Sequence, residues 1–151
     1  MADVDADACA RSAAITAAMA IDEALVRDLL ASQLPAAAAL SITALAGGWD
    51  NRSFRLGDRL VARLPSADRY VASAEKEACV LPLLAGRLPL PIPRLVAHLA
   101  PSARFPRRWS VVEWIEGDTA LAVSGTAQVA LAGGLARFLH ALASVTAGWR
   151  R

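Results

Sequence analysis

Lysine is almost absent from this sequence of 151 residues, because Lys76 is the only lysine among 16 basic residues and every other one is arginine. A site that requires a lysine must therefore use Lys76 or carry an arginine in its place. Cysteine is scarce as well, and Cys9 and Cys79 cannot by themselves form a disulfide framework or a zinc site. This cysteine content is typical of a reducing compartment, so we expect a cytoplasmic protein.

An excess of one charge is also lacking, because 16 basic and 14 acidic residues leave a net charge of +2. This balance argues against a nucleic-acid or membrane partner. The uncharged stretch 119–136 reaches the length of a membrane span, but polar residues and glycines interrupt it, so we expect a soluble helix. The N-terminus is acidic and Arg11 interrupts its alanine-rich stretch, so we expect no secretory signal.

Familiar catalytic and metal-binding constellations are missing too. His98 and His140 have no Asp, Glu or Cys at metal-ligand spacing, so we predict no metal site. No Ser-His-Asp or Cys-His arrangement can be built, and we predict no catalytic residue in this chain. Arg104, Arg107 and Arg108 form a basic cluster, but without interleaved aromatic residues they indicate a solvated loop.

The apolar pattern predicts an α+β fold in which one helix is inserted after the third strand of a five-stranded antiparallel sheet. The expected elements are a helix capped by Asp22 and ended by Pro35, strands at 40–46, 53–56 and 60–64, a helix at 66–84, strands at 94–99 and 109–115, and a helix at 126–145. Glycines provide the turns between the first three strands, and Pro82 should limit the last turn of the inserted helix.

Arg63 and Glu77 are the strongest candidates for a functional pair. Arg63 lies in the third predicted strand, and Glu77 lies on the helix face that should pack against the sheet. A carboxylate on that face needs a cationic partner, because burying it alone is costly. Protein kinases hold nucleotide phosphates with such a strand cation and helix glutamate. The alternative is that both side chains simply face solvent.

Two backbone features add weaker signals. Glycines flank the turn at 47–57, where backbone N–H groups can approach a phosphate, although an ordinary hairpin turn explains them equally well. The apolar strand that ends in residues 113–115 before Gly117 can present N–H and C=O groups to a flat base.

In their order and spacing, these features resemble one known family. The runs GGWDNRSFRLGDRLVARLP, EKEACVLPLLAGRLPLPIPRLVA and FPRRWSVVEWIEGDTA are similar to the N-terminal lobe of aminoglycoside and macrolide phosphotransferase-like kinases. The resemblance covers about residues 21–144. It implies a protein-kinase-like N-terminal lobe with flanking N- and C-terminal helices.

The resemblance also implies a site for ATP or GTP. Along the chain we then expect four parts in this order: a loop over the phosphates, a cation with its helix partner, the back of the adenine pocket, and a hinge that contacts adenine. The residues at these positions are Gly48, Trp49, Asp50 and Asn51; Arg63 and Glu77; Val112; and the backbone of Glu113 to Ile115.

The chain also departs from the family. Its second lobe carries a His-Gly-Asp motif, an Asn and a later magnesium-binding Asp, whereas no Asp follows Asp118 here. We therefore expect no phosphate transfer by this chain alone, and magnesium only if a second lobe is supplied. The expected organisation is a flexible tail at 1–20, the lobe at 21–117, and a linker with the first helix toward a missing C-terminal lobe at 118–151.

Two functions remain open at this point. The first is the nucleotide-binding lobe of a truncated small-molecule kinase that phosphorylates a hydroxyl group. The alternative is a non-catalytic module, derived from that lobe, that binds nucleotide or protein. The apolar stripe of the 126–145 helix should pack on the missing lobe or, in its absence, cause self-association.

Overall fold

The computed structural model describes residues 20–117 and 126–147. Their elements are α2 (Glu23–Gln33), η1 (Pro35–Ala37), β1 (Ile42–Ala44), β2 (Asn51–Leu56), β3 (Leu60–Pro65), η2 (Asp68–Tyr70), α3 (Val71–Leu84), β4 (Leu95–Leu99), β5 (Trp109–Glu113) and α4 (Thr126–Ala147). The predicted tail, apart from Ala20, and the predicted linker at 118–125 lie outside the described residues.

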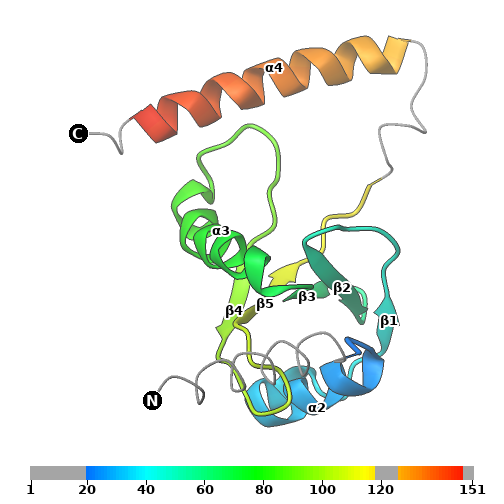
Figure 1. The fold of residues 1–151 in the computed structure, drawn as a ribbon. Helices are drawn as coiled ribbons and strands as arrows, with labels where there is room; N and C mark the ends of the chain where they lie inside the picture. The colour runs from blue at the N-terminus through cyan, green and yellow to red at the C-terminus, as the bar shows by residue number, and fades with distance from the viewer. Residues whose placement is uncertain (1–19, 118–125, 148–151) are drawn as a thin grey trace, which may run out of the picture.

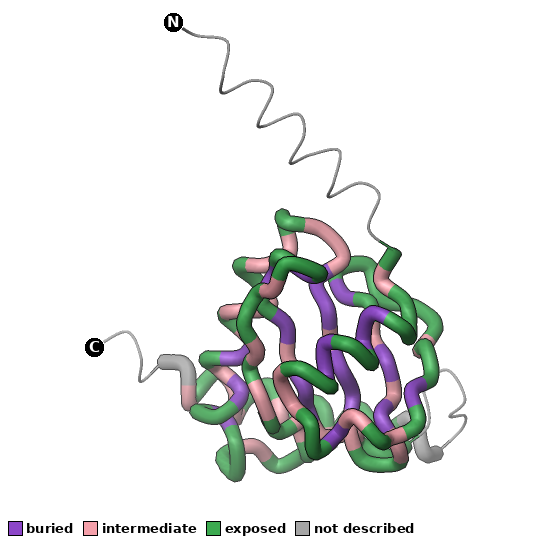
Figure 2. The backbone as a smooth tube through the Cα atoms, turned by 90° about the horizontal axis from the view of Figure 1, so that it is seen from below, coloured by how far each residue is buried: buried purple, intermediate pink, exposed green. Residues whose placement is uncertain are grey.

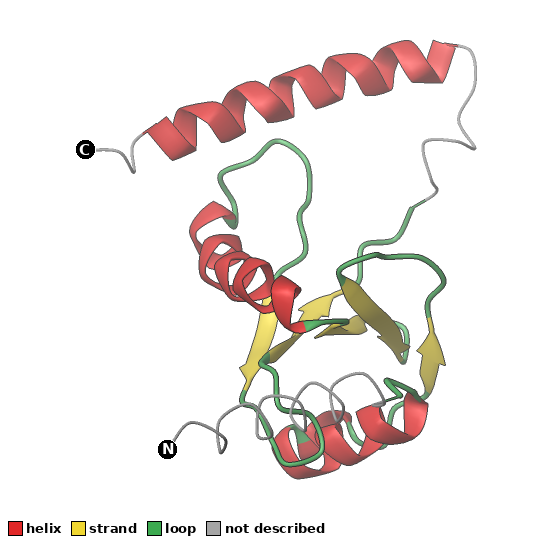
Figure 3. Ribbon diagram, viewed as in Figure 1, coloured by secondary structure: helices red, strands yellow, loops and turns green. Residues whose placement is uncertain are grey.

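The five strands form one antiparallel sheet in the order β1-β2-β3-β5-β4, with α3 inserted after the third strand. This arrangement confirms the predicted α+β fold (Figures 1 and 3). The central strand β3 pairs with both β2 and β5, and its Arg63 lies opposite Ser53 on one side and Ser110 on the other.

Helix α2 covers one face of the sheet. Its N-cap Asp22 accepts a hydrogen bond from the Leu25 N–H at 2.9 Å, as the sequence predicted. Apolar residues of α2 pack with alternate residues of the strands, which makes the central strands the most buried part of the tube in Figure 2. This core includes Leu25, Val26, Leu29, Leu30, Phe54, Leu56, Ala62, Leu64, Phe105, Trp109 and Val111.

Helix α3 lies on the opposite face, where Leu81 packs with Val61 and Val112 in a second apolar cluster. The helix contains Pro82 and ends at Leu84, shortly before Gly86, whose φ is +73°. All of its buried residues belong to the C-terminal half. No residue between Val71 and Glu77 is buried.

Some element boundaries differ from the prediction. The first strand covers only Ile42–Ala44, although Ser41 and Leu45 on either side still hydrogen-bond to Gly57 and Ser53. Strand β2 begins two residues earlier than predicted, at Asn51, because Asn51 still pairs with Pro65. Strand β5 ends at Glu113, which leaves residues 114 and 115 as irregular backbone.

Helix α4 lies beyond α3, on the side away from α2 (Figure 1). Leu131, Leu135 and Leu139 are between 43% and 53% exposed, while Phe138 and Leu142 are half-buried. The predicted apolar stripe is therefore open to solvent on part of its width. No helix among the described residues is long and apolar enough to cross a membrane.

Candidate functional site

The structure brings Arg63 and Glu77 together. Arg63 extends from the middle of β3, and its Nη1 donates to Oε1 of Glu77 on α3 in an ion pair. Both side chains are partly exposed, at 25% and 34%. The alternative that both simply face solvent is therefore wrong. The pair remains open enough for a ligand to reach the guanidinium.

A cavity of about 260 Å³ adjoins this pair. It lies on the α3 side of the sheet, because the buried Val61 and Val112 belong to the apolar cluster with Leu81. Its lining residues are Leu45, Ser53, Val61, Arg63, Pro93, Val112, Glu113, Trp114 and Ile115. The cavity thus has mostly apolar walls, with Arg63 and Glu113 as its charged lining residues, which suits a flat apolar ring that carries a charged group.

The segment 113–115 forms one side of the cavity and is held from both sides. The Glu113 N–H donates to the Arg94 carbonyl at 2.9 Å, and the Trp114 N–H donates to the Arg59 carbonyl at 2.8 Å. Within the described part of the chain, the N–H of Ile115 has no hydrogen-bond partner. Ile115 therefore offers a backbone donor to a bound molecule from a fixed position.

The predicted loop at 48–51 is a fixed turn that does not line this cavity. Ser66, which follows β3, donates through Oγ to the Trp49 carbonyl and through N–H to the Asp50 carbonyl, both at 2.8 Å. The Trp49 side chain is 92% exposed. Asn51 is buried, and its Oδ1 has no hydrogen-bond partner within the residues the structure describes. The turn therefore combines an exposed aromatic ring with a buried asparagine whose amide oxygen has no partner.

Sequence reasoning missed four lining residues of the cavity, namely Leu45, Ser53, Val61 and Pro93, whereas Trp114 lies within the predicted hinge at 113–115. Val61 could have been found, because a residue two positions before Arg63 in a strand lies on the same face. Ser53 could not, because its place opposite Arg63 depends on the register between two strands. Pro93 could not be placed either, since it lies in an irregular segment.

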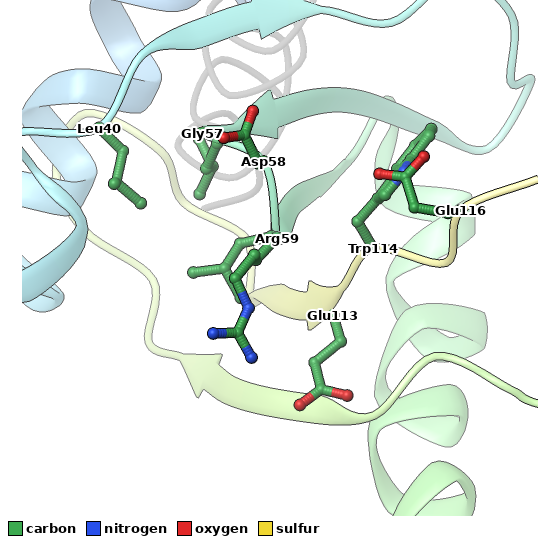
Figure 4. Close-up of a pocket in the computed structure, with 9 residues that line it drawn as sticks. Leu40, Gly57, Asp58, Arg59, Glu113, Trp114 and Glu116 are labelled. Atoms are coloured by element: carbon green, nitrogen blue, oxygen red, sulfur yellow. The ribbon is translucent and has the colours of Figure 1, made fainter.

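Two larger cavities, each of about 710 Å³, lie elsewhere. One is formed around the turn between β2 and β3, where Asp58 and Arg59 lie near Glu113, Trp114 and Glu116 (Figure 4). The other lies between the end of α3 and residues 113–115. Arg63 lines neither of them. The Arg63–Glu77 pair, and not the volume, therefore distinguishes the cavity of about 260 Å³ as the candidate site.

A second charged group supports the segment 113–115 from behind. The Arg55 guanidinium lies 4.0 Å from the centre of the Trp114 ring and donates to Oε1 of Glu116 at 2.8 Å. Two neighbouring groups lower the pKa of Glu116. The largest single effect on this pKa comes from the indole N–H of Trp114, although it makes no hydrogen bond of ordinary geometry, and the next comes from the Arg55 guanidinium. Glu116 is therefore a carboxylate at neutral pH, and the Arg55 side chain stays over the ring.

The arginine cluster differs from the predicted solvated loop. Arg107 is only 3% exposed and donates to Asp68 at 2.6 Å. Arg104 pairs with Asp28 on α2, and Arg108 lies 3.6 Å from Glu75 on α3. The prediction was wrong for Arg107, whose carboxylate partner is remote in the sequence, whereas Arg104 and Arg108 remain 64% and 47% exposed.

Metal binding has no support among the described residues, since no three His, Cys, Asp or Glu side chains gather at one place. Magnesium needs carboxylate oxygens, usually together with substrate phosphates.

Comparison with known proteins adds a family and a fold. Residues 41–150 match the phosphotransferase enzyme family, whereas no curated protein matches the chain. The fold is similar to the GDP complex of wild-type aminoglycoside 2'-phosphotransferase-IIIa, with a TM-score of 0.72 and 24% identity over 80% of this chain and 42% of that one.

Two further structures are also similar. ADP-bound aminoglycoside phosphotransferase APH(2'')-Ib is 21% identical, with a TM-score of 0.58 over 81% of this chain and 40% of that one. The ternary complex of streptomycin, ATP and APH(2'')-IIa is 21% identical, with a TM-score of 0.58 over 82% and 40%. The chain thus spans about two-fifths of the length of these proteins. At this identity, the likeness concerns the kinase-like fold.

Proposed function

Because the chain belongs to the phosphotransferase enzyme family, we propose that its lobe at 21–117 binds a nucleoside triphosphate, ATP or GTP. The observation that carries this proposal is the Arg63–Glu77 ion pair at the border of a narrow apolar cavity. A nucleotide has a flat ring and a chain of phosphates, and the cavity and the guanidinium are complementary to these two parts.

Each candidate residue then has a role. Val61 and Val112 contact the faces of the base, and the free N–H of Ile115 donates a hydrogen bond to its edge. The Glu113 backbone borders the same edge of the base. Arg63 contacts the phosphates, and Glu77 holds the guanidinium in a single orientation. Arginine suits this role because its planar group can bind two phosphate oxygens at once.

The turn at 48–51 covers the phosphates in this proposal. Its backbone is fixed by Ser66, and the two glycines at positions 47 and 48 allow a close approach of the ligand. Asp50 and Asn51 belong to this turn. Trp49 projects into solvent above it.

The names of the similar structures support the nucleotide, because they contain GDP, ADP or ATP. Two of the proteins are named as aminoglycoside phosphotransferases, and a third is bound to streptomycin. By analogy with these proteins, we propose that a complete protein containing this lobe phosphorylates a hydroxyl group of a small molecule.

Phosphate transfer itself requires more than these 151 residues supply. A residue that orients the acceptor hydroxyl and ligands for magnesium are needed. The sequence has neither a His-Gly-Asp motif nor an Asp after Asp118. We therefore assign nucleotide binding to the lobe, and a linker and first helix toward a second lobe to residues 118–151. Magnesium would be bound only when that second lobe is present. We also propose a cytoplasmic location for the protein.

The first prediction tests this proposal through Arg63→Ala. Removal of the charged phosphate contact should weaken ATP binding by about 1.5–3 kcal/mol, or roughly 10- to 150-fold. The dissociation constant can be measured by isothermal titration calorimetry on the 151-residue chain. Arg52→Ala is the matched control, because Arg52 is exposed on β2 opposite Leu64, on the other face of the sheet. Equal affinities of both variants and the wild type would contradict nucleotide binding at Arg63 and favour the non-catalytic binding module.

A further inference from the structure

The part of α3 that carries Glu77 is held by charged contacts and not by the core. No residue of α3 before Ala78 is buried, whereas Ala78, Leu81 and Leu84 anchor the rest of the helix. Glu77 directly precedes the buried Ala78, so its position relative to β3 depends on this anchor together with contacts made near the start of the helix.

These contacts come from the segment that precedes β5. Arg107 is 3% exposed, and its Nε donates to Oδ1 of Asp68 at 2.6 Å, in the η2 turn directly before α3. Its Nη1 donates to the Pro65 carbonyl at 3.3 Å, at the end of β3. Farther along, the Nε of Arg108 lies 3.6 Å from Oε1 of Glu75 on α3.

A single buried guanidinium thus connects the strand of Arg63 to the helix of Glu77. Pro65 lies two residues after Arg63, and Asp68 lies three residues before the first residue of α3. The Phe105 ring, 5.7 Å from the Arg107 guanidinium, packs beside this group in the core. Because Arg107 is enclosed, it can link the two elements at a fixed distance.

We propose that Asp68 and Arg107 are positioning residues for nucleotide binding: their ion pair fixes the start of α3 so that Glu77 meets Arg63. This inference rests on the proposed function, since it assigns the Arg63–Glu77 pair to the phosphates. Neither Asp68 nor Arg107 lines the cavity. They act on the ligand only through the helix and the strand that they join.

The same segment contains an internal control. Arg104 pairs with Asp28, but that pair joins the segment to α2, on the face of the sheet away from the cavity. If arginine–aspartate pairs in this region serve stability alone, Asp68→Asn and Asp28→Asn should have the same kind of effect. If Asp68 positions α3, only Asp68→Asn should change the site.

The test uses the 151-residue chain, ATP as the probe, and hydrogen exchange of the amides at 71–77. Asp68→Asn should weaken ATP binding roughly 2- to 30-fold and accelerate exchange in this segment. Asp68→Glu should recover most of both properties, because it keeps the charge. Asp28→Asn should alter neither. In the Arg63→Ala background, Asp68→Asn should cause no further loss of affinity.

The positioning role is overturned if Asp68→Asn and Asp28→Asn leave exchange at 71–77 equally unchanged, or if Asp68→Asn weakens binding equally with and without Arg63. If the wild-type chain binds no ATP, the proposed function fails, while the exchange measurement still decides whether Asp68 holds α3. Should Asp68→Asn not fold, Glu75→Gln removes the outer, partly exposed ion pair of the same segment and should accelerate the same amides.

Discussion

Gly48 is the residue at which backbone geometry restricts the sequence most clearly. Its φ is +90°, and a Cβ built there would lie 2.8 Å from the carbonyl oxygen of Asn51. The neighbouring Gly47 has the same φ, but a Cβ there would meet nothing within 4 Å. The close approach at Gly48 therefore requires glycine for two reasons, the dihedral angle and the space.

Gly48→Ala should consequently destabilise the chain by about 1–3 kcal/mol, because the new side chain is strained in this conformation and collides with backbone. Thermal or urea unfolding followed by circular dichroism would measure the change. Gly133→Ala is the control, since Gly133 lies within α4 with open space around it and should gain up to about 1 kcal/mol. A Gly48→Ala variant as stable as the wild type would contradict the described turn.

At the scale of single residues, the sequence predicted a contact between two elements that follow each other in the chain. The pairing of Arg63 with Glu77 followed from a strand cation and a carboxylate on the packed face of the next helix. The burial of Arg107 could not be predicted, because its partners are 39 and 42 residues away in the sequence. An arginine in a proline-rich loop is predicted to be solvated, because the sequence does not show which carboxylate the fold brings next to it.

Helix α2 begins at a single capping side chain. The Asp22 carboxylate accepts the Leu25 N–H, which would otherwise be one of the unpaired donors of the first helical turn. This helix covers one whole face of the sheet. A weaker start of α2 should therefore reduce the stability of the core beneath it.

Asp22→Ala should lower the free energy of unfolding by about 0.5–2 kcal/mol, because the cap is lost. Asp22→Asn keeps an acceptor oxygen and should change stability much less. Chemical denaturation of the two variants beside the wild type provides the measurement. If the alanine and asparagine variants proved equally stable, the cap would carry no energetic weight.

Elements as a whole were predictable because α2 has an apolar stripe at helical spacing, whereas β3 is a short apolar run between a glycine turn and a proline. Their ends were not. Strand β2 continues to Asn51 only because Pro65 pairs with it, and β5 stops at Glu113 because the backbone then leaves the sheet. Pairing between distant segments decides such boundaries, and a local pattern does not contain it.

At the scale of the whole molecule, the prominent feature is the open apolar face of α4. Leu131, Leu135 and Leu139 repeat every four residues and remain about half exposed. Exposed apolar surface of this kind favours association, because burial against another surface removes it from water.

The 151-residue chain should therefore self-associate, and the combined change of these three leucines to glutamine should reduce the association. Sedimentation velocity over a range of concentrations would show the difference. Ala132→Gln with Ala136→Gln adds polarity at neighbouring exposed positions of α4 while keeping the leucines, and should leave association unchanged. A wild-type chain that sediments as a monomer at every concentration would contradict the prediction.

The alternation of side chains along β3 has a consequence for insertions and deletions. Val61 and Arg63 line the cavity on one face of the sheet, while Ala62 and Leu64 pack in the core with α2 on the other face. Loss or gain of one residue within this strand would exchange the two sets, turning the guanidinium into the core and a leucine into the cavity. Strand β3 must therefore keep its residue count in any variant that retains both stability and the site.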